Sequence, residues 1–306
     1  TNYQNLKNSF YNNHLSYVLF PLSFLLKIIP FNILSEIIII QVFFGLTLIF
    51  FFKKNYFLIF AYLIFPLVWY NTLLNFHIDI LALPIIWKLI DYNKSENYFK
   101  FTLCLIILLS INFFFSFIVM GIIIYNILEK KGPFNKVYLI SILFFILYFV
   151  FVIIYYLKIE NITYDLFNFE LQKSSGYKIS NIFDSLILII ILFGYFLFFP
   201  FLKSRYILIM LPTLIIYFIS PNNLNLNKFY YHYTLPLIPV IFYSINEKMK
   251  SNNFYKLDFL KKKFKKKNLI ILFILNFIIF NIVFSPSPLS IIFWKKINYF
   301  YYNLNY

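Results

Sequence analysis

Residues 101–128 read FTLCLIILLSINFFFSFIVMGIIIYNIL, an apolar stretch of 28 residues that contains no charged side chain. An α-helix rises about 1.5 Å per residue, so a run of roughly 17–25 apolar residues can cross the ~30 Å core of a bilayer. This stretch is too long for one such span and too short for two. We therefore expect a helical hairpin that turns near Ser110-Ile111-Asn112, or a broken pair of helices.

The whole chain shares this apolar character. Its 306 residues are 62% hydrophobic, 24% aromatic and only 12% charged, with a mean hydropathy of +0.79. Soluble domains carry about 25% charged residues, so this composition excludes an ordinary soluble domain. It predicts an all-α polytopic bundle of about nine to ten membrane segments. The apolar runs lie at residues 31–52, 56–74, 78–90, 101–128, 137–157, 182–202, 206–219, 234–245 and 269–284.

These runs predict one integral membrane domain over residues 1–306. Residues 16–29 are interrupted by Pro21 and Lys27, which predicts a helix lying at the outer interface rather than a span. No signal peptide precedes it, and we expect an earlier span to be missing from the N-terminus. The expected parts are an outer loop and interfacial helix (1–30), core spans (31–245), a basic cytoplasmic loop (246–268), and a last span with an outer tail (269–306).

The net charge of +16 invites a nucleic-acid function, and the placement of the lysines argues against one. The basic residues fall in the gaps between apolar runs, and 19 of the 27 occupy alternate gaps, including nine from Lys248 to Lys267. The positive-inside rule then makes the Lys248–Lys267 loop cytoplasmic and places His14, His77 and His232 outside the cell. The expected partners are membrane lipids, with the basic block on an anionic leaflet, and no nucleic acid.

All three histidines interrupt apolar runs on the same predicted side, and polar side chains at membrane depth tend to mark a site. Asp79 follows His77 by two residues and is the candidate catalytic residue. The simpler alternative is that Asp79 starts a helix, where a carboxylate favours the N-terminal dipole. The candidate substrate-binding residues are His14, His77, His232, Tyr231, Tyr233 and Glu36.

Three histidines and a carboxylate are chemically suited to a metal, but their spacing gives no support for one. No pair of ligands stands at i and i+4, and Cys104 is the only cysteine. We therefore expect no cofactor, with a divalent metal left open.

Three segments resemble the predicted membrane proteins catalogued as domain of unknown function 2079. They are Asn13-His14-Leu15-Ser16, Asn75-Phe76-His77-Ile78-Asp79-Ile80-Leu81-Ala82-Leu83-Pro84, and His232-Tyr233-Thr234-Leu235-Pro236-Leu237-Ile238-Pro239, with Leu211-Pro212 and Ser287-Pro288-Leu289-Ser290 in support. The order and separation match over nearly the whole chain, and the Phe-His block is the most specific. Two positions depart from the family pattern: Ile78 stands where it has proline, and Ile111-Asn112-Phe113 lacks its charged residues.

The resemblance implies a relationship to the membrane-embedded, C-type glycosyltransferases that use lipid-phosphate-linked sugars. It implies an outer cavity, a polyprenyl-phosphate sugar as donor, and Asp79 as the family-matched carboxylate. The lost charge near Asn112 is also consistent with a diverged or inactive copy. The alternatives are a secondary transporter, which should show internal repeats, and a non-catalytic membrane scaffold, which should have a filled core.

Overall fold

The structure is a computed structural model, and it describes part of the chain. The described residues are 41–53, 55–71, 78–129, 139–148, 150, 179–197, 205–219, 234–250, 266–285, 287 and 290. Within these ranges the regular elements are α-helices, short 3-10 helices and π-helical turns at 70–71 and 190–194, and there is no strand.

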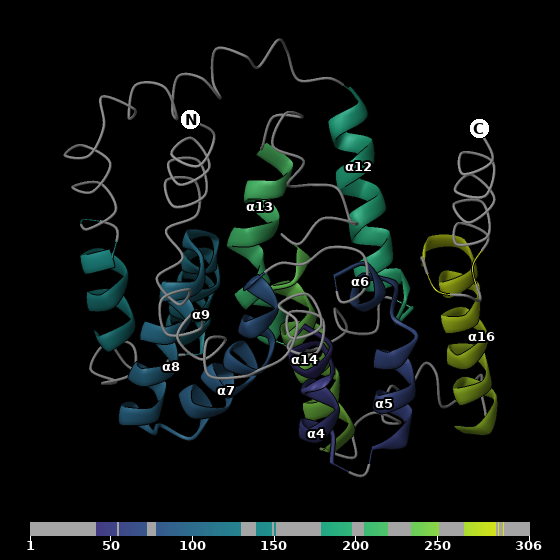
Figure 1. Cartoon of the computed structure of the whole chain (residues 1–306), viewed down its shortest axis with the longest axis horizontal. Coiled ribbons are helices and arrows are strands. Elements are labelled where there is room, and N and C mark those ends of the chain that lie inside the picture. The colour runs from purple at the N-terminus through teal and green to yellow at the C-terminus, as the bar shows by residue number, and fades with distance from the viewer. Residues whose placement is uncertain are drawn as a thin grey trace, which may run out of the picture.

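Figure 1 shows α14 near the middle of the view, with α7, α8 and α9 on one side and α5 and α16 on the other. The bounds in chain order are α4 (Leu48–Phe51), α5 (Tyr56–Leu63), α6 (Pro66–Trp69), η2 (Ile78–Leu81), α7 (Ala82–Lys94), α8 (Tyr98–Ile111), η3 (Phe113–Phe115), α9 (Ser116–Leu128), α12 (Ile179–Ile189), η4 (Ile190–Gly194), η6 (Arg205–Met210), α13 (Leu211–Ile219), α14 (Leu237–Lys250) and α16 (Lys266–Phe284). Residues 139–148 are helical as well.

The expected polytopic membrane bundle is wrong. Across the ranges given above, no helix combines the length and the apolar character needed to cross a membrane. The predicted runs are divided by breaks, and α7, α8, α9 and α14 have 13 or 14 residues each, about 20 Å. The 19-residue α16 opens with Lys266, Lys267 and Asn268, which shortens its apolar part. The multi-pass localisation, with its outer histidines and cytoplasmic Lys248–Lys267 loop, depended on those spans and is wrong for the same reason.

The break predicted near Ser110-Ile111-Asn112 is confirmed. Helix α8 ends at Ile111, and Asn112 adopts an extended backbone with φ −159° and ψ 143°. The chain then resumes as η3 and continues into α9.

A second break divides the predicted run at 56–74, because α5 stops before Pro66 and α6 begins at it. Proline lacks an N–H and its ring clashes with the preceding turn, so the helix cannot continue through it. The backbone carbonyls before the break accept hydrogen bonds from side chains instead. These bonds run from Tyr195 Oη to Ala61 O (2.7 Å), from Trp69 Nε1 to Leu63 O (2.6 Å) and from Asn281 Nδ2 to Ile64 O (2.7 Å).

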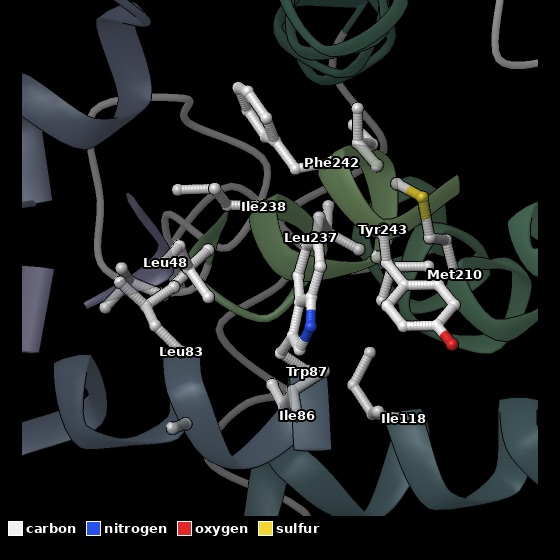
Figure 2. Packing of buried hydrophobic residues seen from close by; sticks show 14 of the residues in the cluster. Leu48, Leu83, Ile86, Trp87, Ile118, Met210, Leu237, Ile238, Phe242 and Tyr243 are labelled. Atoms are coloured by element: carbon white, nitrogen blue, oxygen red, sulfur yellow. The ribbon is translucent and has the colours of Figure 1, made fainter. Parts of the chain in front are cut away.

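An aromatic core joins α7 to α14. Figure 2 shows Trp87 of α7 and Tyr243 of α14 lying side by side, and their ring centroids are 4.9 Å apart. Phe52 packs against Trp87 and stacks on Phe242, with centroids 5.5 Å apart in both pairs. This core holds α7 in place, and the candidate site lies at the start of that helix.

Helix α9 approaches η6 so closely that only glycine fits at the contact. A Cβ added to Gly121 would lie 2.0 Å from the carbonyl oxygen of Ile209 and 2.6 Å from its carbon. Backbone atoms cannot rotate away as a flexible side chain can, so Gly121 sets the distance between these two elements.

Candidate functional site

Asp79 lies in η2, the 3-10 turn that leads directly into α7. Its side chain is 5% exposed, and it stands close to the N-terminal end of α7, where the helix dipole favours negative charge. Pro84 lies in the first turn of α7, where a backbone N–H has no helical partner to lose. The local sequence therefore starts a helix here and buries a carboxyl group at its start.

Asn112 reaches the carboxyl group of Asp79 from the break between α8 and η3. Its Nδ2 donates to both oxygens of Asp79, Oδ1 at 3.1 Å and Oδ2 at 3.2 Å. Its own Oδ1 accepts from the backbone N–H of Phe114 at 3.1 Å. Since the backbone donor needs an oxygen opposite it, this second bond fixes the amide orientation and directs the NH₂ group at Asp79. The break between α8 and η3 therefore positions Asn112 against Asp79.

Burial dominates the electrostatics of this pair. Desolvation raises the pKa of Asp79 to about 7, and the hydrogen bond from Asn112 lowers it only in part. A neutral amide stabilises the carboxylate less than a lysine or arginine would. A carboxyl group with a pKa near neutrality exists in both protonation states at physiological pH, so it can accept or donate a proton. This property makes Asp79 the strongest candidate functional residue in the described part of the chain.

Only Asp79 among the predicted site residues lies within the described ranges. His14, Glu36, His77, Tyr231, His232 and Tyr233 lie outside them. Within the described ranges, no group of three or more His, Cys, Asp or Glu side chains is arranged to hold a metal ion.

Two buried residues next to the histidine segments contact each other. Asn71 precedes the Phe76-His77 segment, Thr234 follows His232-Tyr233, and Asn71 Nδ2 lies 3.3 Å from Thr234 Oγ1. The same Nδ2 donates to Leu67 O at 2.7 Å, and Gln41 Nε2 donates to the backbone oxygen of Asn71 at 2.6 Å. The side-chain oxygen of Asn71 is buried and has no hydrogen-bond partner among the described residues. Segments separated by 163 residues are thus joined by a polar contact inside the fold.

A second polar cluster lies at the other end of α7, and sequence reasoning missed it. Asn93 of α7 and Asn126 of α9 are both buried, and each amide donates to the other at 3.0 Å. Asp79 precedes Asn93 by 14 residues, and Asn112 precedes Asn126 by the same number. Two contacts in the same order, with equal spacing, mean that α7 and α9 run in the same direction beside each other. At 1.5 Å per residue the two contacts are about 21 Å apart.

Charged and tyrosine side chains of α7, α9, η6 and α14 contact one another near this end of α7. Tyr243 donates to Asp91 Oδ1 at 3.2 Å, and the ring of Tyr206 lies 5.1 Å from that of Tyr243 and 5.1 Å from that of Tyr125. Glu247 binds Lys94 and also Lys250, the latter at 2.8 Å, while Arg205 binds Glu129 at 2.9 Å. The sequence signal that could have indicated this cluster was asparagine within apolar helices. The pairing of Asn93 with Asn126 depends on the register of α7 against α9, which the sequence does not show.

Comparison with family models, with curated proteins and with solved structures gives no match for this chain.

Proposed function

We propose that this chain is a glycosyltransferase-like protein that moves a sugar from a lipid-phosphate donor to an acceptor hydroxyl, with Asp79 as general base. The observation that supports the proposal is the buried Asp79 carboxyl group, whose pKa is raised to about 7 and whose position is fixed by Asn112. The resemblance of the Phe76–Pro84 block to domain of unknown function 2079 supplies the substrate class.

The reaction balances with one base. The ionised carboxylate of Asp79 takes the proton of the acceptor hydroxyl, and the hydroxyl oxygen forms a bond to the anomeric carbon of the sugar. The bond from that carbon to the phosphate oxygen breaks, and the lipid phosphate leaves with the electron pair. A base whose pKa lies near the working pH suits this transfer. The proposed phosphate and sugar contacts are His14, His77, His232, Tyr231, Tyr233 and Glu36, all outside the described residues.

A second candidate is a non-catalytic scaffold, and one observation favours it. Both oxygens of Asp79 already accept hydrogen bonds from Asn112, and the side chain is 5% exposed. In this case the pair would serve to lock the break after α8 against the start of α7. The two candidates differ in whether a substrate hydroxyl reaches the carboxylate.

The test is sugar transfer from a synthetic polyprenyl-phosphate sugar in detergent micelles, comparing the natural chain with Asp79→Asn. If Asp79 is the base, the substitution should lower kcat at least 100-fold, and the rate of the natural chain should rise with pH through about 7. Asp91→Asn is the matched control, because it makes the same change at a half-exposed aspartate at the other end of α7. Equal rates for Asp79→Asn and the natural chain, or no transfer by either, would support the scaffold instead.

A further inference from the structure

The lysine and arginine side chains that the structure describes gather at one end of the molecule, which we call the basic end. Helices α7 and α14 finish there, and α5 and α8 begin there. The basic end is opposite to the end that holds Asp79. Its basic residues are Lys53, Lys88, Lys94, Lys100, Arg205, Lys248 and Lys250.

Contacts between helices bring these residues together from distant parts of the sequence. Lys94, the last residue of α7, forms an ion pair with Glu247 near the end of α14. Asn55 Nδ2 donates to Met249 Sδ at 3.3 Å, which places the start of α5 beside the end of α14. Lys53 stands two residues before Asn55 and is exposed.

Helices α8 and α9 contribute to the same end. Helix α8 starts at Tyr98, four residues after the end of α7, so Lys100 lies in its first turn. Helix α9 runs beside α7 in the same direction, and Glu129 at its end binds Arg205 at 2.9 Å. Residues from 53 to 250 thus form one charged surface.

The basic end keeps a positive charge in spite of its ion pairs, because it has four acidic residues against seven basic ones. Lys94, Lys250 and Arg205 form ion pairs and are still 50%, 53% and 69% exposed. Lys53 and Lys100 are exposed and form no ion pair with another described residue. A surface of this kind attracts anions. The four acidic residues are Asp91, Glu96, Glu129 and Glu247.

The most exposed aromatic side chains among the described residues lie at the basic end as well. Phe99 is 79% exposed, Tyr56 is 76% exposed and Phe50 is 73% exposed. Phe99 precedes Lys100, and Phe50 and Tyr56 each stand three residues from Lys53. Exposed leucine and isoleucine side chains occur on several helices, α12 and α16 among them, and single out no surface. The combination of exposed rings with lysines distinguishes the basic end from those faces.

An anionic lipid surface is the partner that uses both kinds of side chain. Aromatic rings are favoured at the headgroup level of a bilayer, and lysines are attracted to the negative charge of the lipids. Ile127 and Leu128, at the end of α9, are each 54% exposed and add aliphatic side chains that can enter the acyl region. Single-stranded nucleic acid also binds lysines and stacks on rings, but it gains nothing from such aliphatic side chains.

We infer that the basic end docks this protein on an anionic lipid surface, with its lysines at the lipid phosphates and Phe50, Tyr56 and Phe99 among the headgroups. Such docking needs no helix to cross the bilayer. The inference is independent of the role proposed for Asp79, which lies roughly 20 Å away along α7 at 1.5 Å per residue.

The test is flotation of the intact chain with phosphatidylcholine vesicles that contain or lack phosphatidylglycerol, at about 30% of the lipid. The double variant Lys53→Gln/Lys100→Gln should weaken binding to the phosphatidylglycerol vesicles at least about fivefold, because each lysine near an anionic leaflet favours binding roughly fivefold. Binding to phosphatidylcholine alone should not change. Added salt should weaken the binding of the natural chain and affect this variant less.

A second variant, Tyr56→Ser/Phe99→Ser, tests the aromatic part and should lower the bound fraction at least about tenfold. The matched control is Phe183→Ser/Leu186→Ser on α12, where the two side chains are 63% and 46% exposed. This control should bind as the natural chain does, because α12 lies away from the basic end: Ser185 donates to Tyr217 O near the end of α13.

Three results would overturn the inference. The first is an equal loss of vesicle binding for the aromatic variant and the α12 control. The second is vesicle binding that does not depend on phosphatidylglycerol. The third is binding of a labelled single-stranded oligonucleotide, lost in both the lysine and the aromatic variants, by a chain that does not bind vesicles. That result would assign the basic end to nucleic acid instead.

Discussion

Polar side chains are buried at both ends of the α7 and α9 pair, but their hydrogen-bond partners differ between the two ends. At the first end the carboxyl group of Asp79 accepts hydrogen bonds from the neutral amide of Asn112. At the second end two neutral amides, Asn93 and Asn126, each donate a hydrogen bond to the other. The first contact joins the segments that lead into α7 and α9, and the second joins the two helices themselves, so the chemistry of the partners differs between the two ends.

The difference appears in the carboxyl pKa values. Burial raises the pKa of Asp79 to about 7. Partial burial also raises that of Glu247, but hydrogen bonds and charge from Lys250 and Lys94 outweigh it and leave the pKa below its ordinary value. Burial alone therefore does not decide whether an acid is ready for proton transfer. For Glu247, the neighbouring Lys250 and Lys94 decide the sign of the pKa shift.

The largest effect on stability should come from Gly121→Ala. This substitution moves α9 away from η6 near the Asn93–Asn126 end and leaves Asp79 and Asn112 unchanged. The added methyl would overlap the backbone of Ile209, so α9 and η6 must move apart and the stacking of Tyr125 on Tyr206 must change. We expect a loss of more than about 3 kcal/mol in the free energy of unfolding, measured with urea. Met120→Ala, at the neighbouring exposed position, is the control and should lose under about 1 kcal/mol. A loss no larger than that control would contradict the close approach.

Asp79→Asn should stabilise the protein at pH 8, on the order of 2–3 kcal/mol. The folded pKa is raised above the unfolded value of 3.8, so the folded state holds the extra proton between about pH 4 and 7. Stability of the natural chain should therefore fall as the pH rises through this window, and the variant should lack that slope. Urea unfolding at pH 4, 6 and 8 measures both chains. If the free energies of unfolding of the two chains change with pH in parallel, burial does not raise the pKa of Asp79.

Asn112→Ala sharpens the comparison by removing the amide that donates to both oxygens of the Asp79 carboxylate. We expect a loss of about 2 kcal/mol at pH 8, where Asp79 is ionised, and a smaller loss at pH 5, where it is protonated. Asn126→Ala removes an amide from the neutral pair and should lose a similar amount at both pH values. Thermal unfolding of the two variants at pH 5 and 8 separates these cases, and identical pH responses would remove the distinction between the two ends.

Glu247→Gln should have the smallest effect, under about 1 kcal/mol at pH 7, because Lys94 and Lys250 are half exposed to water. The folded pKa of Glu247 lies below the unfolded value, so its contribution is present above about pH 4.5 and is lost as the pH falls through the folded pKa. Added salt should remove most of it. A salt-independent loss would show that packing, not charge, is responsible.

Particular residues show which features of the structure could be predicted from the sequence. The break at Ser110-Ile111-Asn112 was predictable because the apolar run is too long for one helix and polar residues interrupt it. The span at 56–74 was wrong because Phe65-Pro66 divides it, and hydropathy averaged over a run is insensitive to a single proline. Asp79 stood out as a carboxylate in an apolar setting. Its partner was not identified, because Asn112 drew notice only as part of the expected turn and as a position where charge is missing.

The pairing of Asn93 with Asn126 could not be predicted from the sequence for a related reason. The matching 14-residue spacing is present in the sequence, but it has meaning only once α7 and α9 are known to run parallel. Side-chain pairing across helices depends on that register, which no local pattern contains.

The most direct test of the central claim is a pH titration of Asp79 itself. The carboxyl carbon is followed by ¹³C NMR in aspartate-labelled chain, and Asp79→Asn identifies its signal. A midpoint near pH 7 is the result expected for a buried carboxyl group held by a neutral amide. A midpoint near pH 4 would show that Asp79 is solvated or paired with a cation, and both the proposed base and the contrast between the two ends would be lost.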